Sequence, residues 1–553
     1  MKKKIICILA GVFLAMAAIA CGNADNNTSG IATEEVKSFT NEELAKKYDA
    51  STIVLSDEKI TVDGKDISTD MESAVYAAND IVFYLEGQDF TYGEGTEDDE
   101  HSQEEADAHT VVHITEPGSY VISGKLSAGQ IAVDLGDGAK KDTENVVTLV
   151  LNNADITCSV APGVIFYNVY ECGDDDEDDA KKDVDTSAAG ANVIIADGSV
   201  NTVNGSYVAR IYESVELNEA GTEVVDSKKL HKYDAAFYSR RSMNINGEEN
   251  GTGVLNIQAE NEGIGTELHL TVNGGNININ SGNDGINTNE EGISVTTING
   301  GSVNITVNGS TGEGDGIDSN GWLVINGGNV TSFACGKSMD AGIDSDNGIH
   351  INGGAVTATG NMLDEIAESE QNYVVFNFME SVSDGSVIAI KDTDGKAVSE
   401  LTAENACSCL VMSTENLTEG IYTLWKDNVQ MSVMQSSGGM YGMMGGRPQM
   451  GGDRLQGEHP PMPEGGMPQF EQGEHPQMPE GEMPQPPEMS EGEIPQKPDR
   501  DLPDGMGMYG DKDWPAERGE TLQIPEESEN TVASMEFSIV SGGNMFVVVE
   551  TAE

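Results

Sequence analysis

The chain has 553 residues, enough for more than one domain, and a formal net charge of −66 from 95 acidic and 29 basic residues. A surface this negative repels phosphate backbones, which argues against a nucleic acid as a partner.

Residues 1–20 are predicted to be a secretion signal, because three lysines precede an apolar stretch and small residues. The Ala-Ile-Ala-Cys ending resembles the lipobox of bacterial lipoproteins. That resemblance implies a lipid on Cys21 and a position on the extracellular face of the cell membrane, anchored by that lipid. The alternative is ordinary signal cleavage beside an incidental cysteine.

Residues 21–50 are expected to form a polar tether that ends in a short helix. Thr40 and Glu43 have the spacing of a capping box, which predicts a helix over 40–48. After this helix, apolar and polar residues alternate between turn residues, as in strands.

An internal repeat dominates residues 51–360. Asn-Gly-Gly begins at Asn273, Asn299, Asn326 and Asn352, with spacings of 26, 27 and 26 residues, and each copy lies between apolar strands. The pattern predicts an all-β fold, a right-handed parallel β-helix in which each repeat is one coil and stacked coils rise by about 4.8 Å. A propeller blade needs about 40 or more residues, and a β-sandwich has no comparable repeat.

The asparagine that precedes each Gly-Gly is expected to be structural. Asparagine tolerates a left-handed backbone, and stacked asparagines can form a ladder of amide hydrogen bonds. Residues 205–240 interrupt the repeat and carry Tyr207, Tyr233 and Tyr238.

The C-terminal part divides into three segments. Residues 361–435 predict a short helix over 361–370 and then a small β cap that closes the open end of the solenoid. Residues 436–520 are rich in Met, Pro, Gly and Glu, which predicts a disordered insert. Residues 521–553 return to strands.

An acidic turn recurs once per repeat, as NDGINTN, GDGIDSNG and DAGIDSD. Stacking would place these carboxylates near one another, and two charges about 5 Å apart repel by about 3 kcal/mol at an effective dielectric of roughly 20. Calcium would relieve the repulsion, since it accepts carboxylate, amide and carbonyl oxygens. The alternative is that these residues are solvated turn formers. The predicted calcium ligands are Asp284, Asp315, Asp318, Asp340, Asp344 and Asp346, with Asn287 and Asn320 as neutral donors.

Two other chemistries compete for these turns. A glycosidase needs two carboxylates roughly 5 to 9.5 Å apart, and stacking alone could supply them. A polyuronate lyase needs a strong base, but Lys337 is the only lysine or arginine between 243 and 360, with His269 and His350 as weaker candidates.

The cysteines show no zinc-ligand spacing and predict no disulfide.

Trp322 follows the GDGIDSN turn and is the candidate aromatic surface for a sugar. Packing against a neighbouring coil is the alternative explanation for this side chain.

Taken together, residues 55–430 resemble a bacterial carbohydrate-binding domain family of parallel β-helices, related in fold to pectate lyases and found in secreted or lipid-anchored proteins. The resemblance rests on ITEPGSYVISGKLSAGQIAVDL, VVTLVLNNADIT, NVIIADGSVNTV and the rungs with Gly-Ile and Asn-Gly-Gly. It implies a non-catalytic binder of cellulose or polygalacturonate, with calcium at the acidic turns.

The sequence therefore predicts a lipid-anchored surface protein that binds polysaccharide through a calcium-stabilised β-helix without cleaving it. One alternative is a polysaccharide hydrolase or lyase that uses the same turns. The other is a structural adhesin or stalk with a protein ligand. The oligomeric state is left open.

Overall fold

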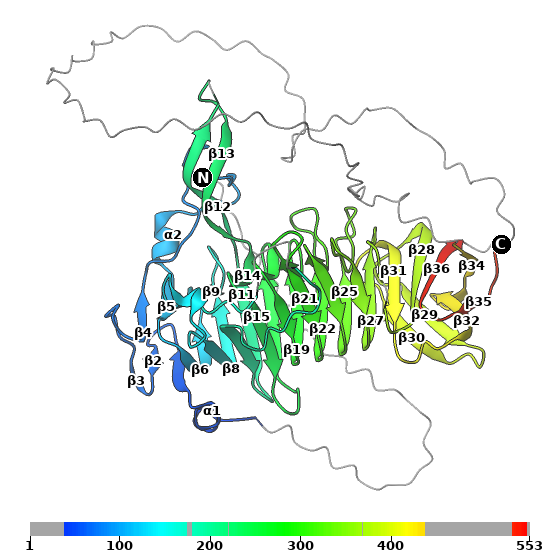
Figure 1. The fold of residues 1–553 in the computed structure, drawn as a ribbon, viewed down its shortest axis with the longest axis horizontal. Coiled ribbons are helices and arrows are strands. Elements are labelled where there is room, and N and C mark those ends of the chain that lie inside the picture. The colour runs from blue at the N-terminus through cyan, green and yellow to red at the C-terminus, as the bar shows by residue number, and fades with distance from the viewer. Residues whose placement is uncertain (1–37, 174–179, 219, 368, 437–532, 550–553) are drawn as a thin grey trace, which may run out of the picture. The chain divides into compact units, whose positions relative to one another are not determined.

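The computed structural model describes residues 38–173, 180–218, 220–367, 369–436 and 533–549 (Figure 1). The predicted signal, Cys21 and nearly all of the 436–520 insert lie outside these residues. The described chain is all-β, as predicted. Its helices are α1 (Asn41–Tyr48), α2 (Gln103–Asp107) and the single 3-10 turn η1 (Ala139–Lys141).

Three ladders of parallel strands form the main part of the fold (Figure 1). The first contains β1 (Ser51–Leu55), β6 (Gly118–Leu126), β8 (Val147–Thr157), β10 (Ala191–Ile195), β15 (Met243–Gly247), β18 (Leu270–Val272), β21 (Val295–Ile298), β24 (Trp322–Ile325) and β26 (Ile349–Ile351). The second continues from β8 through β11 (Val200–Gly205), β16 (Val254–Ala259), β19 (Asn276–Ser281), β22 (Ser302–Val307), β25 (Asn329–Phe333) and β27 (Ala355–Gly360).

The third ladder carries the acidic turns. It contains β5 (Thr110–Ile114), β7 (Gly129–Asp134), β9 (Val164–Asn168), β14 (Ala235–Ser239), β17 (Glu262–Thr266), β20 (Ile286–Thr288) and β23 (Ile317–Ser319), with β4 (Val75–Ala78) antiparallel to β5. The repeats from Asn273 to Asn326 each contribute one strand to each ladder, while the repeat from Asn326 to Asn352 contributes none to the third, which ends at β23.

Apolar side chains of successive repeats stack in register. In the first ladder, Ile245, Val272, Ile298, Ile325 and Ile351 are paired strand to strand, and all five are fully buried. Strands β19 and β22 alternate buried and partly buried residues along their length. Because each fully buried aliphatic side chain contributes about 1.5–3 kcal/mol, these columns supply most of the driving force for folding.

The asparagine ladder is present, but the left-handed residue was predicted wrongly. The Nδ2 group of Asn299 donates to Oδ1 of Asn273 at 2.9 Å, and Asn326 donates to Asn299 at the same distance. The positive φ belongs to the second glycine of each Asn-Gly-Gly, for example 82° at Gly301. A Cβ at Gly301 would lie 2.5 Å from the carbonyl oxygen of Gly275, so only glycine permits this close approach.

The predicted helix over 40–48 is confirmed as α1, with both hydrogen bonds of the capping box. The helix predicted over 361–370 is wrong. Residues 362–365 form neither helix nor strand, and Ile366 forms a parallel bridge with Ile349 at the end of the first ladder. Pairing with an open strand edge prevails over the local helical pattern. Helix α2 was not predicted.

Antiparallel strands follow the last repeat. Strand β31 (Cys407–Ser413) pairs with β27, and β28 (Tyr373–Val382), β34 (Ser432–Gln435) and β36 (Gly543–Val549) extend the sheet. A second small sheet contains β29 (Val387–Asp392), β30 (Ala397–Thr402), β32 (Gly420–Lys426), β33 (Val429–Gln430) and β35 (Phe537–Ile539). The change to antiparallel pairing ends the stack of parallel repeats.

Two short excursions leave the ladders. Strands β12 (Val208–Leu217) and β13 (Val224–Tyr233) form a hairpin within the segment that interrupts the repeat. Strands β2 (Thr61–Val62) and β3 (Lys65–Asp66) extend from the edge of β1.

Candidate functional site

The third ladder brings the acidic turns into register. Strands β20 and β23 align Asn287 with Asp318, and the backbone N–H of Asp344 donates to the carbonyl of Ile317 at 2.7 Å. Side chains separated by about 26 to 31 residues therefore lie next to one another. We call this group the acidic ladder: Glu262, Asp284, Asn287, Asp315, Asp318, Asn320 and Asp344.

The carboxylates of the acidic ladder bind the backbone of the next repeat. Oδ1 of Asp284 accepts the N–H of Asp315 at 2.7 Å, and Oδ1 of Asp315 accepts the N–H of Ala341 at 2.5 Å. Each bond crosses from one repeat to the next. These carboxylates thus stabilise the register of the turns.

Amide groups lie between the carboxylates. The Nδ2 group of Asn287 lies within hydrogen-bonding distance of Oε1 of Glu262 at 3.2 Å and of Oδ2 of Asp284 at 3.3 Å. Asn320 donates to Oδ1 of Asn287 at 3.3 Å. The amides separate the negative charges and satisfy some of their oxygens.

Burial makes the charged forms of these carboxyl groups unfavourable. It raises the pKa of Asp284 to about 8, with the charge of Asp318 as a further cause. Burial and a hydrogen bond with Asp364 raise the pKa of Asp344 to about 9. The pKa values of Asp315 and Glu262 also lie well above their usual range, chiefly because of burial and then of neighbouring carboxylates. Without a cation, protons are therefore held on the ladder at neutral pH.

Two buried oxygens of the ladder accept no hydrogen bond within the described chain, namely Oε2 of Glu262 and Oδ1 of Asp344. Such orphaned acceptors, together with nearby amide and carbonyl oxygens, are the donor chemistry that calcium prefers. Across residues 38–173, 180–218, 220–367, 369–436 and 533–549, no three His, Cys, Asp or Glu side chains gather closely enough to hold an ion by themselves. A calcium ion here would therefore also require amide, backbone or water oxygens.

The other two predicted ligands lie at the margin of this group. Asp340 accepts the backbone N–H of Gly314 at 2.7 Å and the hydroxyl of Ser338. Asp346 is exposed.

The sequence prediction missed Glu262, which is only 4% exposed. Its Glu-Gly-Ile occupies the place of Asp-Gly-Ile at Asp284 and Asp315, so treating Glu and Asp as equivalent in the motif would have found it. Asp234, one strand earlier, is also buried and pairs with Lys232 at 2.5 Å.

Trp322 begins β24 and is half-buried. Its indole ring contacts no aromatic ring or cation among the described residues. The ring therefore has partial exposure of the kind that a sugar-stacking surface needs.

The basic residues considered for a lyase have other partners. Nζ of Lys337 donates to the carbonyl of Gly309 at 3.0 Å. His269 is buried, which lowers its pKa to about 4, and its Nδ1 accepts the N–H of Val295 at 3.1 Å. His350 is half-buried in β26, in the first ladder. Neither Lys337 nor His269 contacts the acidic ladder.

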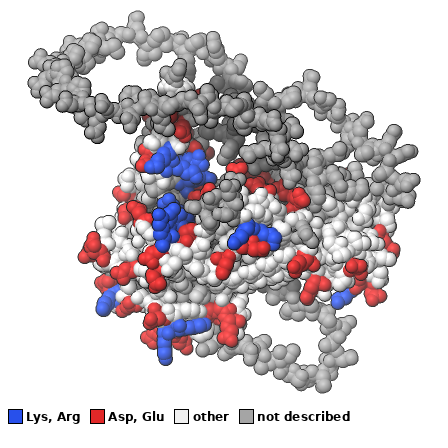
Figure 2. Space-filling model, viewed as in Figure 1, with Lys and Arg blue, Asp and Glu red and all other residues white. Residues whose placement is uncertain are grey.

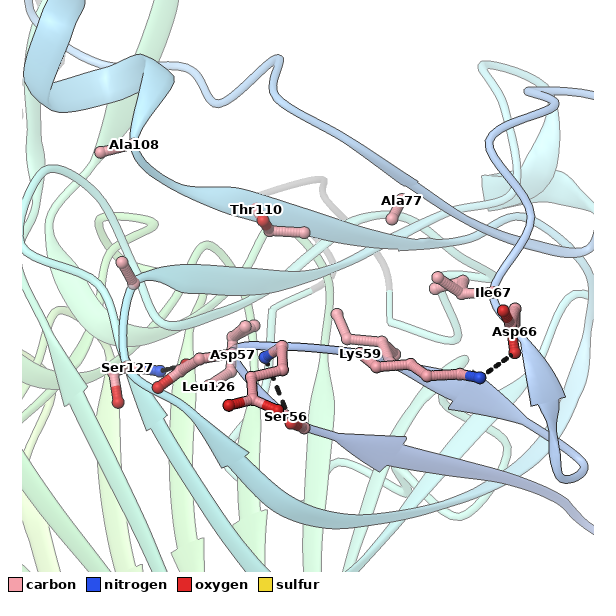
Figure 3. A pocket seen from close by; sticks show the side chains of 13 residues that line it. Ser56, Asp57, Lys59, Asp66, Ile67, Ala77, Ala108, Thr110, Leu126 and Ser127 are labelled. Carbon is pink, nitrogen blue, oxygen red and sulfur yellow. Dashed lines mark hydrogen bonds and ion pairs between the residues drawn. The ribbon is translucent and has the colours of Figure 1, made fainter.

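A hollow of about 380 Å³ lies beside β1 and the first strands of the ladders (Figure 3). Several of its polar groups are paired with one another: Asp57 accepts the N–H of Ser127 at 2.6 Å, and Lys59 pairs with Asp66 at 2.6 Å. Its lining contains no aromatic residue. It therefore lacks a surface for stacking a sugar ring.

The five cysteines in the described chain are free thiols. No helix in this part of the chain is long and apolar enough to cross a membrane.

Two known proteins are similar to parts of this chain. A carbohydrate-binding domain-containing protein of Acetivibrio thermocellus is 31% identical over 166 residues, which are 30% of this chain and 43% of that protein. The match thus spans less than half of that relative. A solved polysaccharide lyase-like protein from C. thermocellum, studied as a gadolinium derivative, has 22% identity and a TM-score of 0.31, over 54% of this chain and 90% of that one.

The family model of carbohydrate-binding domain-containing proteins matches residues 108–405, which is more than half of the chain and includes the whole acidic ladder. The chain therefore belongs to the family of carbohydrate-binding domain-containing proteins.

Proposed function

We propose that this protein binds polysaccharide at the cell surface without cleaving it. The observation that carries the proposal is the acidic ladder, a row of oxygen ligands repeated along parallel strands in a chain of the carbohydrate-binding domain-containing family. A polysaccharide is itself a repeating ligand, so a repeating surface can contact several of its units.

We infer that the three ladders are the three faces of a right-handed parallel β-helix. The inference is supported by parallel pairing in every ladder between repeats, by the 26- or 27-residue period and by one apolar core shared among the ladders. In such a solenoid, the acidic ladder follows one edge of the stack.

Calcium between neighbouring repeats is the second part of the proposal. Asp284, Asp315, Asp318 and Asp344 would supply carboxylate oxygens, while Asn287 and Asn320 would supply amide oxygens. Burial is the main cause of the raised pKa values of Asp284 and Asp344, and the charge of Asp318 adds to both; a cation would relieve this repulsion. When bound, calcium would neutralise these carboxylates and could bridge to hydroxyl or carboxylate groups of a sugar.

The absence of cleavage is proposed from the roles of the side chains. Asp284 and Asp315 are engaged with backbone N–H groups of the next repeat, and neither Lys337 nor His269 approaches the ladder as a base. A hydrolase is the second candidate, because a carboxyl group with a pKa of about 8, such as Asp284, remains a proton donor at neutral pH.

The polysaccharide is proposed to be a plant cell-wall glucan or polygalacturonate. Binding of the full chain to cellulose, soluble glucans and polygalacturonate should be measured with calcium and with chelator, and the products should be assayed for new reducing ends and unsaturated sugars. Binding without new products supports the proposal. New products that disappear in Asp315→Ala establish the enzyme, while failure to bind any of these polymers with calcium favours an adhesin with a protein ligand.

The cell-surface location is proposed from the N-terminal sequence alone. Export and lipid attachment at Cys21 predict incorporation of labelled fatty acid in cells, and Cys21→Ser should abolish it and release the protein. Retention of the label by Cys21→Ser would overturn the anchor.

A further inference from the structure

A second cavity lies where the β12–β13 hairpin meets the third ladder. It has a volume of about 300 Å³, at the lower end of the range for small-molecule sites. The lining residues are Lys229, Leu230, Lys232, Tyr233, Arg240, Arg241, Glu267, Leu268 and Glu290. The hairpin belongs to the segment that interrupts the repeat, so the cavity is a feature added to the stack.

The charge of this lining is opposite in sign to that of the chain. Four of its residues are lysine or arginine and two are glutamate, whereas the whole chain has 29 basic and 95 acidic residues. Figure 2 shows lysine and arginine side chains gathered over the hairpin, while the other described atoms of that face are mostly red and white. A local cluster of this kind attracts an anion that the remainder of the protein repels.

Two of these cations are uncommitted. Lys232 pairs with Asp234 at 2.5 Å, whereas no side-chain hydrogen bond or ion pair joins Arg240 or Lys229 to another described residue. Arg240 interacts through its charge with Tyr233, and Lys229 with Asp234. Arg240 is only half-exposed, and a partly desolvated guanidinium without a partner is unfavourable. An oxyanion would supply the missing acceptor, since guanidinium groups bind carboxylate and sulfate through paired hydrogen bonds.

One wall of the cavity is backed by packed tyrosine rings. Tyr233 is 2% exposed, and its ring packs on Tyr167 at 5.4 Å and on Tyr238 at 5.5 Å between centroids. The hydroxyl of Tyr238 donates to Glu267. This tyrosine cluster packs the base of the hairpin against the ladder and supports the backbone that carries Lys229 and Arg240.

The cavity lies beside the acidic ladder. Lys232 of the lining is close enough to Glu262 for their charges to interact, and Asn320 follows Ser319 at the same strand end at which Glu267 follows Thr266. Glu262 is the first residue of β17, and Glu267 of the lining follows its last residue. A saccharide bound in the cavity would therefore lie next to the ladder.

We propose that this cavity binds the oxyanion group, a carboxylate or a sulfate, of an acidic saccharide without a bridging metal. The inference rests on the proposed polysaccharide binding and adds a charge-selective subsite to it. Arg240 and Lys229 bind the oxyanion, Lys232 stays paired with Asp234, and Glu267 and Glu290 accept hydroxyl groups of the same sugar.

Isothermal titration of the full chain, in chelator, should compare a uronate tetrasaccharide, a sulfated glucan tetrasaccharide and the unmodified glucan tetrasaccharide. We expect at least one acidic ligand to bind and the neutral one to bind more weakly. Arg240→Gln and Lys229→Gln should each weaken acidic binding by about 10- to 100-fold, as loss of a charged hydrogen bond predicts. The two acidic ligands distinguish a carboxylate site from a sulfate site.

Lys228→Gln is the matched control, because Lys228 lies on the same strand but pairs with Glu213 and is absent from the lining. Lys229 is exposed, so its variant keeps the test informative if Arg240→Gln does not fold. No acidic binding in chelator, or equal binding by wild type and both variants, overturns the subsite. Glucan binding with calcium, measured on the same variants, reports separately on the proposed polysaccharide binding.

Discussion

Oδ1 of Asp284 accepts a hydrogen bond from the backbone N–H of Asp315, 31 residues later in the chain, at 2.7 Å. Asp315 repeats the interaction with Ala341. Each carboxylate is therefore both a structural bond between repeats and a negative charge close to the next carboxylate. This double role determines how the ladder responds to charge removal, metal and pH.

The Asp315→Asn variant should distinguish the effect of charge repulsion between ladder carboxylates from the effect of calcium binding. The change removes one charge while keeping the shape and an acceptor oxygen, so in chelator at pH 8 we expect stabilisation on the order of 1–3 kcal/mol. Calcium should raise the melting temperature of the wild type but have little effect on Asp315→Asn. Differential scanning calorimetry measures both. Asp346→Asn, at an exposed position, is the control. Equal calcium shifts in wild type and Asp315→Asn would contradict the role of Asp315 as a ligand.

The pH dependence without calcium follows from the raised pKa values. Asp284 and Asp344 have ordinary pKa values near 3.8 when unfolded and about 8 and 9 when folded. The folded state therefore binds more protons between these values, so stability falls as the pH rises from about 4 to about 9. Chemical denaturation in chelator at pH 5, 7 and 9 should show this decrease, and calcium should diminish it. A flat profile in chelator would show that the carboxyl groups titrate normally.

The Asn-Gly-Gly turn offers a paired test of stability. Gly301→Ala places a Cβ 2.5 Å from the carbonyl oxygen of Gly275 at a φ of 82°, so we expect a loss of about 2 kcal/mol or more. Asn299→Ala removes amide bonds that are exposed, and should cost about 1 kcal/mol. Urea denaturation measures both losses. A larger loss for Asn299→Ala would mean that the amide ladder, rather than the glycine, limits the turn.

Trp322→Ala tests the proposed sugar-stacking surface. Loss of a half-buried ring that stacks on a sugar should weaken glucan binding by about tenfold, while the melting temperature changes little because the ring is incompletely buried. Affinity electrophoresis in gels containing glucan provides the measurement. Trp425→Ala is matched in residue type, and Trp425 lies in β32 beside Lys391, outside the three ladders. If the two variants bind alike, Trp322 serves packing only.

Much of the repeat could be predicted from the sequence. The 26- or 27-residue period, the two-residue alternation and the asparagine before each Gly-Gly are local patterns, and their buried columns and amide ladder are present. The capping box at Thr40 is equally local and formed as expected. Six of the eight predicted calcium ligands also lie together in the acidic ladder, because stacked copies of one turn must meet.

Other features depend on contacts between distant segments. Ile366 bridges Ile349 because the strand edge there is open, and the left-handed backbone lies on Gly301, where the carbonyl of Gly275 leaves no room for a Cβ. Burial of Glu262, and the meeting of Lys229 with Arg240, result from how the hairpin and the ladder pack. The sequence by itself determined the repeat and its core, because periodicity is a local property of the chain. Only the tertiary structure decided which charges are buried and which cations share a cavity, because desolvation depends on neighbours that are remote in sequence.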